Sequence, residues 1–68
     1  MKQVLLKELK KGDFFTLRDY GEYPDESRVY VRGEYERSEK KYSCTKYSDW
    51  CAETFKKGTT KVYTDFTF

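Results

Sequence analysis

Residues 28–47 alternate between apolar and polar positions with a period of two, which is the pattern of half-buried β-strands. Two runs rich in Val, Tyr and Thr, at 28–35 and 41–47, flank a polar segment at 36–40. Strand-forming residues on both sides of a short polar segment predict a β-hairpin. We take this hairpin as the element around which the rest of the chain folds.

The register of the hairpin follows from placing Tyr35 opposite Tyr42, which also sets Glu36 against Lys41. Opposite charges on facing positions favour that pairing. The same register fixes the pairs towards the other end of the hairpin, which are Tyr30 with Tyr47, Arg32 with Thr45, and Glu34 with Ser43.

Side chains alternate between the two faces of a strand, so this register predicts one apolar and one polar face. The buried face collects Val29, Val31, Gly33, Tyr35, Tyr42 and Cys44. The solvated face collects Tyr30, Arg32, Glu34, Ser43, Thr45 and Tyr47. Gly33 stands in mid-strand without a side chain, which indicates a bulge or a sharp bend that curls the sheet.

Further strands are predicted at 4–6, 14–17 and 61–68, with a turn at Gly12 and a loop at 18–27. Phe15 and Leu17 share one face of the second strand. In the last strand Val62, Phe66 and Phe68 share a face. The segment 48–58 is predicted to be an irregular connection with at most one helical turn, from which Trp50 and Phe55 reach the core.

These elements predict an all-β fold in one domain, residues 1–68. We expect a single small curled antiparallel sheet or a Src-homology-3-like barrel of four to five strands. A β-meander packed on a short helix at 49–57 is the alternative. A chain of this length buries only about 60% of its unfolded surface, which leaves little room for a deep active-site cavity.

The net charge of +2 says little about partners, but acidic residues are concentrated between 19 and 27, where no base occurs. Nucleic-acid binders usually carry a stronger basic footprint. The apolar run at 4–6 is too short for a signal peptide, and no stretch is long enough to span a membrane. We therefore expect a cytoplasmic protein without a membrane partner, in which Cys44 and Cys51 stay reduced.

The chain has no His, no phosphate-binding glycine loop and no Ser or Cys with a visible base partner. We therefore expect no enzyme, no catalytic residue and no cofactor. Cys44 and Cys51 lack the two further ligands that a structural zinc site needs, so no metal site is expected. Small thiols packed beside Trp50 are the simpler interpretation.

One surface combines aromatic and basic residues and is our candidate contact surface: Tyr30, Arg32, Lys46 and Tyr47. It predicts a non-enzymatic binding or interaction module, for which protein–protein contact or self-association is the leading hypothesis, because Tyr and Arg are enriched at interfaces. The alternative is a small nucleic-acid-binding β-barrel, because aromatic platforms beside basic side chains hold single strands.

Three stretches resemble a group of short, uncharacterised bacterial proteins. They are Leu-Lys-Lys-Gly-Asp-Phe-Phe at 9–15, Val-Arg-Gly-Glu-Tyr-Glu-Arg-Ser-Glu-Lys-Lys-Tyr at 31–42 and the terminal Val-Tyr-Thr-Asp-Phe-Thr-Phe. The first stretch also resembles the opening of many small Src-homology-3-like barrels. The resemblance implies a compact β-fold of small-barrel type and carries over no activity.

Overall fold

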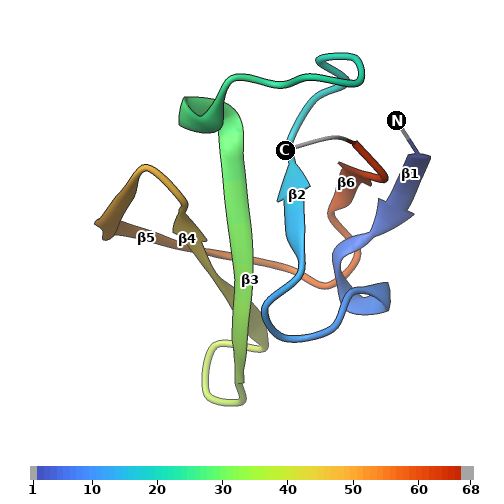
Figure 1. Ribbon diagram of the computed structural model, residues 1–68. Coiled ribbons are helices and arrows are strands. Elements are labelled where there is room, and N and C mark those ends of the chain that lie inside the picture. The colour runs from blue at the N-terminus through green and yellow to red at the C-terminus, as the bar shows by residue number, and fades with distance from the viewer. Residues whose placement is uncertain (1, 67–68) are drawn as a thin grey trace.

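A computed structural model describes residues 2–66, which form one antiparallel sheet of six strands (Figure 1). The strands are β1 (Lys2–Leu5), β2 (Phe14–Thr16), β3 (Val29–Glu36), β4 (Lys41–Lys46), β5 (Asp49–Lys56) and β6 (Lys61–Thr64). Two short 3₁₀ turns are η1 (Leu6–Glu8) and η2 (Glu26–Arg28). The strand order is β1-β6-β2-β3-β4-β5, so the predicted all-β class is confirmed.

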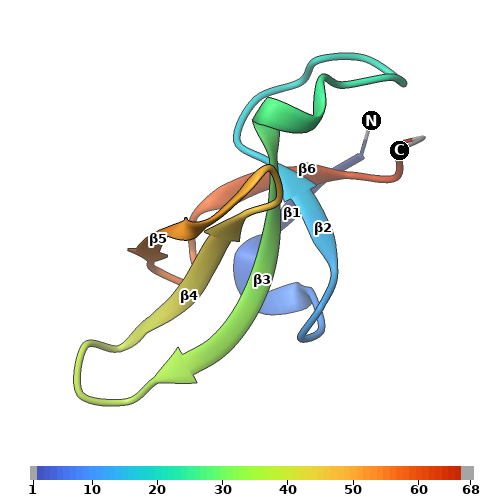
Figure 2. The same ribbon diagram turned by 60° about the vertical axis from the view of Figure 1, so that its left-hand side comes forward.

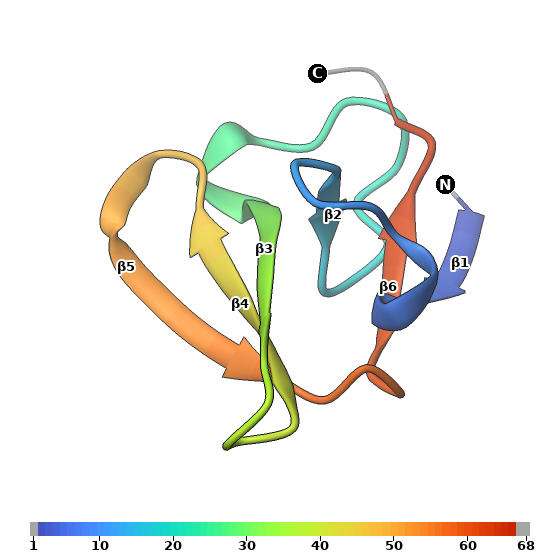
Figure 3. The same cartoon turned by 90° about the horizontal axis from the view of Figure 1, so that it is seen from below.

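The sheet curls without closing, as Figure 3 shows, and β1 and β5 are its two edges. Of the two predicted forms, the described part of the chain adopts the curled sheet, with six strands rather than four or five. The junction between β2 and β6 is narrow, because only Thr16 and Tyr63 pair there.

The prediction for residues 48–58 is wrong, because most of this segment forms β5. Exposed and half-buried positions alternate from Cys51 to Lys56, which is a strand period. The hydrophobic pattern of the sequence does not indicate this strand, because the polar residues Thr54 and Lys56 occupy half-buried positions while Phe55 is 43% exposed. Phe55 therefore does not reach the core, and the side chain of Trp50 lies outside the described part of the structure.

The core cluster is built around four fully buried residues: Leu6, Phe15, Cys44 and Val62. Half-buried side chains pack against them, namely Val4, Leu9, Leu17, Tyr30 and Tyr42. Phe15 and Leu17 thus share a face, as predicted. Val62 is buried as expected, but Asp65 ends the strand region with a positive φ of 64°, and Phe68 lies outside the described residues.

The predicted register holds only at the turn end of the hairpin. Tyr35 faces Tyr42 as expected, but the register shifts between Arg32 and Tyr35, so that Tyr30 faces Lys46 and Arg32 faces Cys44. The cause is a bulge, which puts an extra residue into β3. Gly33 makes it possible, because a Cβ at this position would lie 3.2 Å from the Ser43 Cβ and Oγ atoms.

The shift turns Tyr30 and Arg32 to the core side of β3, against the prediction, whereas Val29 is fully buried as predicted. Tyr30 packs against the core cluster and its ring stacks on that of Phe15, with 5.8 Å between centroids. Arg32 lies on the same side, because its partner Cys44 belongs to that cluster. Val31, expected to be buried with Tyr35 and Tyr42, pairs with Phe14 and is only half-buried.

Two loops hold β3 in place. In the middle of the strand, the backbone N–H of Gly12 donates to the Arg32 carbonyl at 2.8 Å, and Gly12 adopts the positive φ of 93° that favours glycine. At the start of the strand, the predicted loop leads through η2 into β3, and its Pro24 is buried. The hairpin of β3 and β4 extends beyond the rest of the sheet (Figure 2).

Candidate binding sites at the two ends of the hairpin

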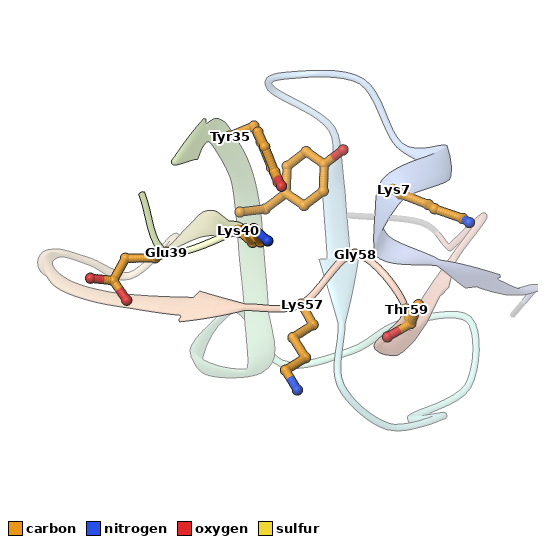
Figure 4. Close-up of a pocket in the computed structure, with 8 residues that line it drawn as sticks. Lys7, Tyr35, Glu39, Lys40, Lys57, Gly58 and Thr59 are labelled. Atoms are coloured by element: carbon orange, nitrogen blue, oxygen red, sulfur yellow. The ribbon is translucent and has the colours of Figure 1, made fainter. Parts of the chain in front are cut away.

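A pocket of about 550 Å³ opens beside the turn end of the hairpin (Figure 4). We call it the hairpin pocket; it is lined by Lys7, Tyr35, Glu39, Lys40, Tyr42, Lys57, Gly58 and Thr59. These residues come from η1, from the hairpin and from the connection between β5 and β6. The pocket therefore depends on the tertiary fold rather than on one segment.

Two tyrosine rings form the aromatic part of the hairpin pocket. Tyr35 and Tyr42 face each other across β3 and β4, and their ring centroids lie 4.9 Å apart. The Arg32 guanidinium carbon lies 4.1 Å from the centroid of the Tyr42 ring, a cation–π contact that restrains this ring. Tyr35 is 45% exposed, so it presents aromatic surface to solvent.

Backbone contacts bring the lysines of the hairpin pocket to the rings. The Lys7 N–H donates to the Gly58 carbonyl at 3.0 Å, which ties η1 to the connection that carries Lys57. A Cβ at Gly58 would lie 3.0 Å from both the Lys7 Cβ and the Tyr42 Cε2 atoms. Glycine at this position therefore allows the close approach of the two segments.

The charge of the hairpin pocket is predominantly positive. Three lysines line it against one carboxylate, and Figure 4 shows the side chains of Glu39, Lys7 and Lys57 all pointing away from Tyr35. Lys11 and Glu34 form an exposed ion pair, and this hydrogen bond lowers the pKa of Glu34. Neither residue lines the hairpin pocket, so Glu34 does not neutralise its lysines there.

A second pocket, of about 300 Å³, lies at the opposite end of the hairpin. We call it the loop pocket; it is lined by Leu17, Arg18, Tyr20, Ser27, Arg28, Tyr30 and Lys46. The guanidinium carbon of Arg28 lies 5.5 Å from the centroid of the Tyr20 ring. Three cationic side chains and no carboxylate line this pocket.

Two of the four acidic residues in the neighbouring loop are engaged with the loop's own backbone. Asp19 accepts a hydrogen bond from the Gly21 N–H at 3.0 Å, and Asp25 accepts one from the Ser27 N–H at 3.1 Å. The contact with Ser27 lowers the pKa of Asp25, so this carboxylate stays ionised at neutral pH. The loop therefore remains negative beside a pocket that is lined by bases.

The structure does not place the predicted contact residues in one stripe. Tyr30 and Lys46 face each other and line the loop pocket. Arg32, expected to be solvated, is half-buried, and its Nε atom is buried without a hydrogen-bond partner. Tyr47 makes an edge-to-face contact with Phe14, with 5.6 Å between centroids.

Sequence reasoning missed the hairpin pocket, although part of its signal is visible. Lys40 and Tyr42 are close in sequence, and Lys57 precedes a glycine. Nothing in the sequence around Lys7 indicates that it lines this pocket, because the hydrogen bond to Gly58 brings it to the pocket only in the folded chain.

The two cysteines are free thiols in different surroundings. Cys44 is fully buried, and this burial raises the pKa of its thiol to about 11. Cys51 is exposed rather than packed away as predicted. Among residues 2–66, no group of three or more His, Cys, Asp or Glu side chains is arranged to hold a metal ion.

Comparisons with protein-family models, with curated proteins and with solved structures found no match. In the part of the chain that the structure describes, neither helical turn has the length or the apolar character needed to cross a membrane.

Proposed function

We propose that this protein is a non-enzymatic binding module that holds single-stranded nucleic acid at the hairpin pocket. The observation that carries the proposal is the combination of two tyrosine rings with three lysines and one carboxylate. The volume of about 550 Å³ lies within the range of small-ligand sites. An aromatic surface with a cationic rim is complementary to a planar base that is linked to phosphate.

Each part of the hairpin pocket has a defined role in this proposal. The exposed ring of Tyr35 stacks on a base, a contact that contributes about 1–3 kcal/mol in single-strand binders. Lys7, Lys40 and Lys57 neutralise neighbouring phosphates. Stacking tolerates every base, so we expect weak sequence preference and a preference for single strands over duplex, in which the base faces are covered.

The test is fluorescence anisotropy with labelled single-stranded DNA and RNA over a range of salt concentrations. Three phosphate contacts predict that log K falls with log salt with a slope of about −2. Tyr35→Ala should weaken binding roughly tenfold, which is about 1.4 kcal/mol. Lys57→Glu should weaken it more than Lys2→Glu, which makes the same charge change at an exposed position on β1.

Two results would overturn the proposal. One is the absence of binding to any single strand at low salt. The other is an equal loss in Lys57→Glu and Lys2→Glu together with unchanged binding in Tyr35→Ala, because that pattern would indicate general charge attraction without a site.

Self-association is the second candidate function, and the open edge of β5 favours it. This strand has eight residues, and Phe55 is 43% exposed on it. Unpaired backbone groups at a sheet edge are a template for another strand. Antiparallel pairing with a second copy would bring the acidic half of one β5, with Asp49 and Glu53, towards Lys56 of the other.

Light scattering over a range of concentrations tests this candidate. We expect a dimer mass that Phe55→Lys converts to a monomer mass, while a monomer at every concentration would contradict self-association. The cytoplasmic location and the Src-homology-3-like type of barrel stay predictions from the sequence.

A further inference from the structure

The loop pocket shares its chemistry with the hairpin pocket but differs from it in what its rings can do. Tyr30 stacks on Phe15, and the Arg28 guanidinium carbon lies 5.5 Å from the centroid of the Tyr20 ring, which is 38% exposed, so both rings already have partners. The pocket is also smaller, at about 300 Å³ against about 550 Å³. These features disfavour insertion of a base and leave the cations as the groups that can hold a ligand.

Three cations of the loop pocket come from three separate elements. Arg18 follows β2, Arg28 belongs to η2 and Lys46 ends β4. Guanidinium groups match the oxygens of a phosphate in a fork geometry, and an ammonium group adds a point charge. No carboxylate lines the pocket itself, although the ionised Asp25 of the neighbouring loop interacts electrostatically with Arg28.

We infer that the loop pocket is a second subsite, which binds a phosphate of the same nucleic-acid strand whose base occupies the hairpin pocket. This inference rests on the proposed function. Tyr30 and Tyr35 mark the two ends on β3, and five residues of strand span about 16 Å. A strand of several nucleotides therefore reaches both subsites, and a very short one reaches only the first.

Linking two contacts in one ligand raises affinity once the ligand is long enough to span them. The experiment measures the affinity of oligothymidylates from two to twelve nucleotides for the wild-type protein, Arg28→Ala and Lys46→Gln. For the wild type we expect affinity to rise in a step of tenfold or more at the oligonucleotide length that first spans both pockets, because the second contact then becomes intramolecular. Both variants should lose that step and keep the wild-type affinity for the shortest oligonucleotides.

Lys2→Ala is the matched control, because it removes one positive charge at an exposed position of β1. It should keep the step. Circular dichroism and thermal melting establish that each variant is folded, and Lys46→Gln keeps the test valid if Arg28→Ala loses its contact with Tyr20 and unfolds. The salt slope for long oligonucleotides should fall by about 0.7 in either pocket variant, since one phosphate contact is lost.

Three outcomes would overturn the inference. Wild-type affinity that rises smoothly with length, or a step that survives in both variants, would overturn the second subsite and leave the hairpin pocket intact. A uniform loss at all lengths in both variants would also overturn it, because the pocket would then act only through net charge. If no oligonucleotide binds, the proposed function fails and the second subsite fails with it.

Discussion

The two pockets contain the same kinds of side chain, yet their tyrosines have different surroundings. At the loop end, Tyr30 is half-buried and stacks on Phe15 in the core. At the turn end, Tyr35 is 45% exposed and contacts only the hairpin partner Tyr42 among the ring pairs described. The comparison teaches that distance from the core, rather than residue type, decides which tyrosine is available to a ligand.

The bulge at Gly33 separates these two environments. Before it, β3 directs Tyr30 and Arg32 towards the core side of the sheet. After it, the strand belongs to the part of the hairpin that extends beyond the rest of the molecule (Figure 2). One extra residue therefore separates the half of the hairpin that packs on the core and lines the loop pocket from the half that lines the hairpin pocket.

Truncating the two tyrosines should separate these roles most clearly. Tyr30→Ala should lower the free energy of unfolding by about 2–4 kcal/mol, because a packed ring is removed from the edge of the core. Tyr35→Ala should lower it by less than about 1 kcal/mol, since much of this ring is already in water. Urea unfolding measures both values, and equal losses would remove the distinction between the two ends.

Arg32→Glu should lower the free energy of unfolding by about 1–2 kcal/mol. It removes the cation–π contact with Tyr42 and places a carboxylate at a half-buried position. It should also weaken binding at the hairpin pocket, because the Tyr42 ring loses its restraint. Arg37→Glu in the exposed turn is the control, and an equally small effect of both substitutions would show that Arg32 is solvated after all.

Gly33→Ala should lower the free energy of unfolding by about 1 kcal/mol, because the new methyl group meets the Ser43 side chain. Ser43→Gly should relieve part of this contact, so a double-mutant cycle should give favourable coupling. Additive losses in urea unfolding would mean that Gly33 does not set the bulge by its contact with Ser43.

On β4, Cys44 lies between Tyr42 of the hairpin pocket and Lys46 of the loop pocket, and it is fully buried. In the native protein, iodoacetamide should modify Cys51 quickly and Cys44 only after unfolding, as peptide mass spectrometry would show. Rapid native labelling of Cys44 would instead indicate one continuous groove from pocket to pocket.

The raised pKa of Cys44 also predicts a small effect of pH on stability. The folded thiol keeps its proton to about pH 11, whereas the ordinary value is 9.0, so the unfolded chain binds fewer protons between these values. The free energy of unfolding should therefore fall as the pH rises from about 9. The free energy of unfolding, measured with urea, should fall less steeply with pH in Cys44→Ala than in the wild type. Identical pH dependences of the two proteins would contradict the raised pKa of Cys44.

Local pattern was enough to predict the hairpin, its turn-end pairing and the strands around Phe15 and Val62. It failed at β5, where Thr54 and Lys56 face inwards and Phe55 faces outwards, against their ordinary preferences. It failed at Tyr30 and Arg32 because the bulge shifts their pairing by one residue, and Gly33 alone did not indicate on which side of it the predicted register would hold. The hairpin pocket was not predicted, because Lys7 and Tyr42 are distant in sequence and come close only in the folded chain, where both lie beside Gly58.

The position of β6 has a consequence for how the chain is made. Among the described strands it comes last in the sequence, yet it lies between β1 and β2, and its Val62 belongs to the buried core cluster. β1 can pair only after β6 has been made, because Lys2 faces Thr64. The meander of β2, β3, β4 and β5 can form earlier. Contacts between such distant residues slow folding. The growing chain therefore carries an unfinished sheet until β6 inserts between β1 and β2 and completes the core.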